Sequence, residues 1–191
     1  MKKTLLIAAV SSLVTAGAFA APATYDVDPA HTYPAFEADL MGGLSLWRGK
    51  AKTTSGKIVY DAAAKTGTVD ITVDMKSLDF GHDKMNQHAN SPDIFDTAKF
   101  PTATFKGTLA KFNGEAPTEV QGELTMHGVT KPVTLKLNSF MCKQNPMSKK
   151  DICGADAVGM INREDFGVAY GKQMGFKMDV KLLISIEAIK A

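Results

Sequence analysis

The chain has 191 residues and a formal net charge of +2, with 45% hydrophobic and 22% charged residues. This length suits one domain with a sizeable core. The charged residues form neither the basic stripe of a nucleic-acid-binding protein nor the lysine-lined amphipathic helix of a membrane-surface protein. Composition therefore excludes nucleic acid as the expected partner.

The first residues have the features of a secretory signal peptide. Two lysines precede an apolar run over residues 5–14, and a small-residue Ala-Phe-Ala ending follows at 18–20. The run is shorter than the about 20 residues of a membrane span, and the ending predicts cleavage after Ala20. We expect residues 1–20 to be a signal peptide and residues 21–191 to be one periplasmic domain. No stable membrane insertion is expected after cleavage.

Alternating apolar and polar residues predict strands along most of the remaining chain. The alternation recurs over residues 69–75, 102–109, 120–127, 133–138 and 176–186. Each stretch has one apolar face and is separated from the next by turn-forming residues. Such strands favour an antiparallel sheet that closes on itself and leaves few edges. We therefore predict an all-β fold, an up-and-down antiparallel barrel of about eight strands.

A short helical insertion is expected near residues 82–95. Residues 82–89 suit one or two helical turns. Ser91 followed by Pro92 fits the N-cap and first position of a second short helix. Residues 121–133 then predict a β-hairpin, because Gly128 separates two alternating runs.

The two cysteines, Cys142 and Cys153, are expected to form a disulfide in an oxidising compartment. We expect one strand to end at Phe140 and the next to begin at Ala155, so that the bridge closes the polar loop between them. A loop of about a dozen residues gives a stabilisation of roughly 3 kcal/mol. Because no Cys-x-x-Cys or neighbouring ligand histidine is present, the bridge is interpreted as structural.

Four histidines, at positions 31, 82, 88 and 127, are candidates for metal binding or acid–base chemistry. His82 and His88 are six residues apart and do not share a helix face. No His-Glu-x-x-His, Gly-x-Ser-x-Gly or phosphate-binding glycine loop is present. We therefore predict no catalytic residue, no bound metal and no cofactor. A histidine-based metalloenzyme stays open as an alternative.

Four sequence blocks resemble the YceI-like family of bacterial lipocalin-like barrels. Residues 122–133 read Gly-x-Leu-Thr-x-His-Gly-Val-Thr-Lys-Pro-Val, similar to the family's hallmark. Residues 25–31, 96–105 and 161–167 resemble its opening strand, its central Phe-Pro segment and its Asn-Arg-x-Asp-Phe-Gly block. The resemblance implies a barrel that binds isoprenoid or fatty amphiphiles, with the helical insertion as a lid over the barrel mouth.

Two positions depart from the family pattern. Asp39 stands where the family usually has a second histidine, and Trp47-Arg48-Gly49-Lys50 stands where the family usually continues with Gly-x-Phe. Both departures fall at one end of the expected pocket.

Strand parity and the resemblance together give a candidate lipid tunnel. Small inward residues leave volume, and the ten methionines suit a long flexible apolar ligand. The expected tunnel residues are Phe36, Phe105, Gly107, Gly122, Leu124, Met126, Phe176 and Met178. Replacing Gly107 or Gly122 by Phe is expected to block ligand without unfolding the barrel. In the alternative interpretation, the methionines only fill gaps in a packed core.

Three polar residues are assigned either to the mouth of the tunnel or to structural roles: His31, His127 and Arg163. Arg163 is expected to pair with Asp165 or Asp28, or to meet a ligand head group.

The predicted function is a periplasmic binding protein, not an enzyme, that holds a polyisoprenoid or fatty chain for transport, storage or protection. The expected partner is a lipophilic small molecule, and a homodimer is compatible with this prediction. A surface or secreted interaction protein without ligand is the alternative.

Overall fold

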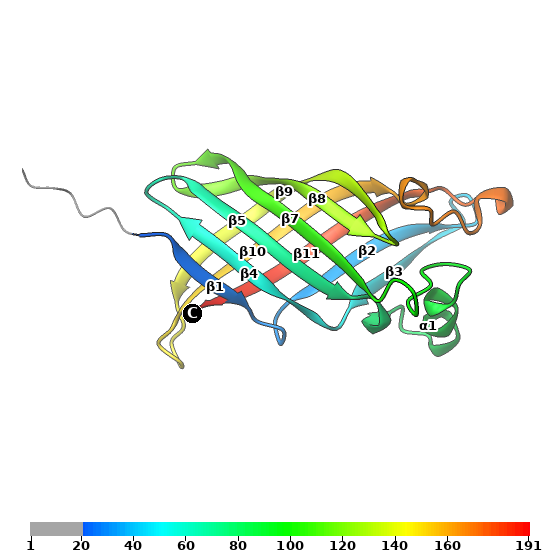
Figure 1. Ribbon diagram of the computed structural model, residues 1–191, viewed down its shortest axis with the longest axis horizontal. Coiled ribbons are helices and arrows are strands. Elements are labelled where there is room, and N and C mark those ends of the chain that lie inside the picture. The colour runs from blue at the N-terminus through cyan, green and yellow to red at the C-terminus, as the bar shows by residue number, and fades with distance from the viewer. Residues whose placement is uncertain (1–20) are drawn as a thin grey trace, which may run out of the picture.

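The computed structural model describes residues 21–191, so the signal peptide expected over residues 1–20 lies outside the described residues. The described chain contains eleven strands, one α-helix and three 3-10 helices (Figure 1). In chain order they are β1 (Ala23–Val27), β2 (Tyr33–Leu40), β3 (Ser45–Ala51), β4 (Thr54–Asp61), β5 (Thr66–Asp74), η1 (Met75–Ser77), β6 (Leu78–Asp79), α1 (Asp83–Asn90), β7 (Thr102–Asn113), β8 (Ala116–Met126), β9 (Val129–Gln144), β10 (Asp151–Asn162), η2 (Arg163–Phe166), η3 (Lys172–Met174) and β11 (Asp179–Lys190).

Eight strands within residues 21–191 close into an antiparallel barrel. Their order is β1-β4-β5-β7-β8-β9-β10-β11, and pairing of β1 with β11 completes the ring. The predicted all-β up-and-down barrel is therefore confirmed. Closure pairs strand edges that an open sheet would expose. In the same described range, no helix is long and apolar enough to cross a membrane.

One edge of strand β11 pairs with two strands along its length, while its other edge pairs with β10. Its last residues pair with β1, while Val180–Ser185 pair with β2. The loop between β1 and β2 is fixed at the branch point, because Asp28 N and the Thr32 hydroxyl both donate to the carbonyl of Glu187. Strands β2, β3 and β6 thus extend the sheet beyond the closed ring.

The hairpin expected over residues 121–133 is confirmed. Strands β8 and β9 are joined by His127 and Gly128, with φ angles of 51° and 76°. Two residues with positive φ are typical of the tight turns that match the twist of paired strands, and glycine adopts this conformation without steric cost.

The helical insertion contains α1, which matches the helix expected from His82, but the second helix expected at Ser91 is wrong. His82 is the N-cap of α1, since Met85 N donates to His82 Nδ1 at 3.2 Å. Ser91 ends α1, because both its backbone N–H and its hydroxyl donate to the carbonyl of His88. Residues 92–95 then form turns. Ser91 is therefore used as a C-cap, which sequence pattern alone does not distinguish from an N-cap.

The disulfide Cys142–Cys153 is present, but the strand ends expected beside it are wrong. Strand β9 continues to Gln144 and β10 begins at Asp151, so the two cysteines are direct cross-strand partners. The turn is short because Asn145 accepts two backbone N–H groups through its side chain and donates its own N–H to Lys150. The bridge therefore joins two paired strands instead of closing an irregular loop.

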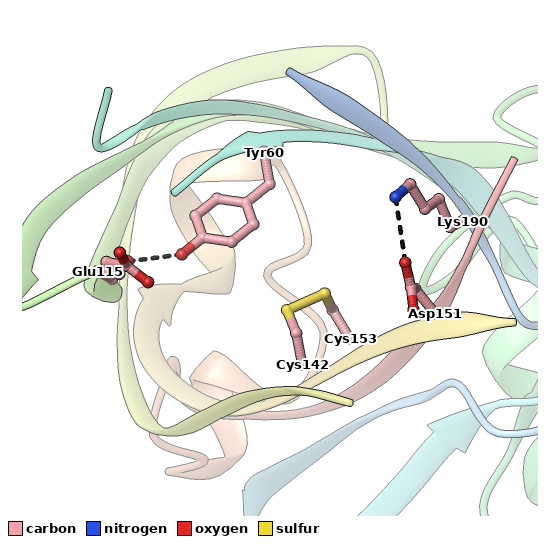
Figure 2. The surroundings of a disulfide bond; sticks show 6 residues. All are labelled: Tyr60, Glu115, Cys142, Asp151, Cys153 and Lys190. Atoms are coloured by element: carbon pink, nitrogen blue, oxygen red, sulfur yellow. Dashed lines mark hydrogen bonds and ion pairs between the residues drawn. A yellow bond between two sulfur atoms is a disulfide. The ribbon is translucent and has the colours of Figure 1, made fainter. Parts of the chain in front are cut away.

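The surroundings of the disulfide tie the same end of the barrel together (Figure 2). The Tyr60 hydroxyl on β4 donates to the carbonyl of Glu115 at 2.6 Å. Lys190 at the end of β11 pairs with Asp151 at 3.1 Å. Helix α1 lies at the opposite end of the barrel (Figure 1).

Candidate functional site

The barrel encloses a cavity of about 470 Å³. Aliphatic and aromatic side chains from the strands and from the insertion line nearly all of it. The lining side chains with a hydroxyl, imidazole or guanidinium group are Thr32, Thr54, His88, Arg163 and Tyr170. At one end the cavity is lined by α1 and its flanking residues. At the other it reaches Phe140 and Ala155, which lie two residues from the disulfide. It therefore extends along most of the barrel.

Five of the eight predicted tunnel residues line this cavity: Phe36, Phe105, Leu124, Met126 and Phe176. Met178 is buried but does not line the cavity, because it precedes β11 and lies in the segment that bonds to Arg163 N. Phe176 also precedes β11, so the strand expected from residue 176 begins only at Asp179.

Gly107 and Gly122 are opposite one another on β7 and β8, under the ring of Phe105. A Cβ on Gly122 would lie 2.8 Å from Phe105 Cζ, and a Cβ on Gly107 would lie 2.8 Å from the carbonyl oxygen of Gln121. Both glycines thus provide room for Phe105 and for close backbone approach. A Cβ at either position meets backbone atoms at less than 3.0 Å, which argues against the expectation that Phe there would block the cavity without disturbing the barrel.

The mouth of the cavity is framed by four aromatic rings, Trp47, Phe80, His88 and Tyr170. Phe80 packs on Trp47 with ring centroids 5.8 Å apart, and His88 packs edge-on against Tyr170 at 4.8 Å. Tyr170 both lines the cavity and is 38% exposed, so the cavity reaches the surface here. The insertion therefore covers this end, in contact with β3 on one side and with the loop after η2 on the other.

The insertion is held over the mouth by side-chain amides. Asn86 donates to Asp79 Oδ1 at 2.9 Å and accepts from Phe80 N at 2.8 Å. The hydrogen bond from Asn86 is the largest cause that lowers the pKa of Asp79. Asn90 accepts from the buried Thr97 hydroxyl at 2.8 Å. These bonds fix the middle and the C-terminal end of α1 and hence the position of His88.

Arg163 forms hydrogen bonds with backbone carbonyls of the loop at the mouth. Its guanidinium donates to the carbonyl of Val168 at 2.9 Å and to that of Tyr170 at 2.7 Å. Burial lowers its pKa, and the nearby charge of Asp39 acts in the opposite direction. The expected pairing with Asp165 or Asp28 is wrong, because two loop carbonyls take the donors. Arg163 thereby positions Tyr170 at the mouth.

His31 lies outside the cavity, in the loop between β1 and β2. Its Nδ1 is 2.7 Å from Asp28 Oδ2, a hydrogen bond that raises the pKa of His31 and lowers that of Asp28. Asp28, His31 and Glu187 offer ligand atoms within 4.8 Å of one another, as a metal ion would need. None of these three residues lines the cavity, and the hydrogen bond accounts for the geometry of two of them.

His127 also has a structural role, because its ring contacts other parts of the protein. Its Nδ1 lies 3.1 Å from the carbonyl oxygen of Phe166, and its ring packs on Phe100 with centroids 4.4 Å apart. The histidine thus links the β8–β9 turn to η2.

Sequence reasoning missed several lining residues. Phe80 and Tyr170 lie in irregular segments, where no periodicity marks an inward position. Thr54 was detectable: it shares strand parity with Ile58, so the apolar face of residues 58–60 extrapolates to it.

Comparisons with known proteins agree with this architecture. Residues 25–188 match the YceI-like domain family. The chain is 33% identical to protein YceI of Escherichia coli over 197 residues, which covers 100% of this chain and 99% of that protein. The crystal structure of Burkholderia cenocepacia BcnA is similar with a TM-score of 0.69 and 24% identity, over 85% of this chain and 99% of that one.

A second solved structure, described as a polyisoprenoid binding domain from Saccharophagus degradans, is similar with a TM-score of 0.61. It is 16% identical over 87% of this chain and 98% of that one. These neighbours share the fold. The chain belongs to the YceI-like family.

Proposed function

We propose that this YceI-like protein is a periplasmic binding protein that holds a long lipophilic chain inside its barrel. The observation that carries the proposal is the apolar cavity of about 470 Å³, which runs from the mouth at Tyr170 to Phe140 near the disulfide. Each methylene buried there contributes about 0.8 kcal/mol. A long chain therefore binds tightly without elaborate polar contacts.

A polyisoprenoid or fatty chain fits the lining best. Met75, Met85 and Met126 line the cavity, and methionine adapts its shape to flexible apolar partners. The description of the Saccharophagus neighbour as a polyisoprenoid binding domain supports an isoprenoid chain. Transport, storage and protection of such a chain all use the same enclosure.

We also propose that the protein is not an enzyme. The polar groups at the mouth are engaged with the protein: Arg163 donates to two carbonyls, and the His88 ring packs on Tyr170. No cofactor is part of the proposal. Periplasmic location is supported by the signal features of residues 1–20 and by the disulfide, which an oxidising compartment favours.

The test is mass spectrometry of organic extracts from the purified, signal-cleaved protein, with native mass spectrometry of the intact complex. We expect one polyprenyl or fatty species in stoichiometric amount, lost on denaturation. Protein that is empty and also takes up no prenyl lipid from added vesicles would overturn the proposal and favour an interaction protein without ligand.

A further inference from the structure

One polar atom inside the cavity has no partner. Thr54, the first residue of β4, is 2% exposed, lies opposite Val73 of β5 and lines the cavity. Its hydroxyl is buried and makes no hydrogen bond to any group in residues 21–191. Buried hydroxyls in folded proteins are normally paired, because an unpaired one loses its hydration without compensation.

The other buried threonines of the described chain show how this protein treats such groups. Thr32, which also lines the cavity, donates to the Glu187 carbonyl and accepts from the Glu187 N–H, both at 3.1 Å. Thr97 donates to the side chain of Asn90. Among these buried threonine hydroxyls, that of Thr54 is the exception.

The described residues around Thr54 provide no hydrogen-bond partner for its hydroxyl. The carbonyl of the preceding Thr53 accepts from Asp74 N, and the Thr53 N–H donates to the Ser77 hydroxyl. Buried apolar side chains of β3, η1 and β6 line the same cavity: Ala51, Met75 and Leu78. A buried water needs two to four polar partners, and the Thr32 hydroxyl is already engaged. The partner of Thr54 must therefore come with the cargo.

We propose that Thr54 is a hydrogen-bonding subsite inside the tunnel, and that the physiological cargo carries an oxygen function, a hydroxyl or a carbonyl, along its chain. This inference rests on the proposed lipid-binding function and specifies the chemical class of the lipid. A threonine hydroxyl both donates and accepts, so it pairs with either oxygen function. A plain hydrocarbon chain leaves the hydroxyl unpaired, and the tunnel therefore selects a chain that carries a hydroxyl or carbonyl over one that carries neither.

The test compares hexadecanoic acid with a series of monohydroxyhexadecanoic acids in which the hydroxyl moves along the chain. Kd is measured for the wild-type protein, for Thr54→Val, which keeps the branched shape without the hydroxyl, and for Thr54→Ser, which keeps the hydroxyl. We expect the wild type to bind one narrow range of positions about five- to tenfold more tightly than hexadecanoic acid, the effect of one hydrogen bond. Thr54→Val should abolish this preference, and Thr54→Ser should restore it.

Stability of the lipid-free protein gives an independent readout. Because the hydroxyl is unpaired when the cavity holds no oxygenated chain, Thr54→Val should leave Tm unchanged or raise it. A clear fall in Tm would overturn the inference, since it would show that the protein itself satisfies this hydroxyl.

The remaining outcomes separate this inference from the proposed function. If hexadecanoic acid and every hydroxy derivative bind equally well, lipid binding stands and the Thr54 subsite is refuted. If the preference persists in Thr54→Val, another group of the protein binds the ligand hydroxyl, and the subsite is again refuted. If neither these probes nor prenyl lipids bind, the proposed function fails and the inference fails with it.

Discussion

Filling the middle of the cavity should strongly weaken lipid binding without unfolding the barrel, and Ala157→Phe is the substitution that tests this. Ala157 lies in the middle of β10 between Leu137 on β9 and Ile184 on β11, and its side chain lines the cavity. Benzene fills an engineered cavity of about 150 Å³, so an added phenyl ring takes about a third of the 470 Å³ available. The ring therefore has room, and the barrel should fold.

The expected loss follows from the displaced chain. If hexadecanoic acid fills the cavity, losing a third of the space removes about five methylenes from the barrel, or about 4 kcal/mol at ~0.8 kcal/mol each. This corresponds to a Kd roughly a thousandfold weaker. The assay is displacement of a fluorescent fatty acid, with Tm measured in parallel to establish folding.

The matched control is Val158→Phe on the same strand. Val158 is the next residue and faces the outside of the barrel, because successive strand side chains alternate between faces. It adds the same ring without entering the cavity, so its Kd should equal that of the wild type. A folded Ala157→Phe protein that binds within threefold of the wild type would refute the assignment of the cavity as the lipid site.

Three further results are expected. Replacing Cys142 and Cys153 by serine should lower the free energy of unfolding by about 3 kcal/mol, the effect of opening a loop with a sequence separation of 11; urea denaturation measures this, and an unchanged midpoint would contradict it. Arg163→Lys should lower the free energy of unfolding by about 2 kcal/mol, because lysine cannot donate to two carbonyls in fixed geometry. The backbone amides of residues 167–171 should then exchange hydrogen faster, and unchanged exchange there would show that Arg163 does not hold this loop. The ion pair of His31 with Asp28 should stabilise the protein most between pH 3.8 and 6.5. The pKa of His31 is raised from 6.5, so its stabilisation is fully present below that pH and is lost as the pH rises through the raised pKa. The pKa of Asp28 is lowered from 3.8, so its stabilisation is lost as the pH falls below 3.8 through the lowered pKa. The Tm difference between the wild type and His31→Gln should follow this window, and a difference independent of pH would rule out the ion pair.

The strands were predictable because each has a buried and a solvated face. In β7, Phe105 and Leu109 line the cavity while Lys106 and Thr108 are exposed, and this alternation is visible in the sequence. The hairpin at Gly128 was predictable for a related reason, since a two-residue turn demands positive φ. Local pattern thus gave the barrel and most of its inner face.

Parity could not show which inward positions reach the cavity. Gly107 and Gly122 face inward as expected, yet the ring of Phe105 covers them. Which residue covers which depends on the size of side chains on neighbouring strands, and that is set by register. Arg163 was predicted as a mouth or structural residue, but its partners were not, because they are backbone carbonyls, which no residue pattern reveals.

The two positions that depart from the family pattern, Asp39 and Trp47, lie at the end of the barrel near the mouth of the cavity. Asp39 Oδ2 accepts from Gly42 N at 2.8 Å and from Lys177 N at 3.0 Å, which ties the β2–β3 turn to the segment before β11. The hydrogen bond from Lys177 N is the largest cause that lowers the pKa of Asp39. A carboxylate accepts both N–H groups at once, whereas a neutral imidazole has a single acceptor nitrogen. Asp39 therefore joins two chain segments at the entrance, and Trp47 meets the insertion through Phe80 beside them. Both positions thus hold segments together at the end of the barrel where the insertion lies.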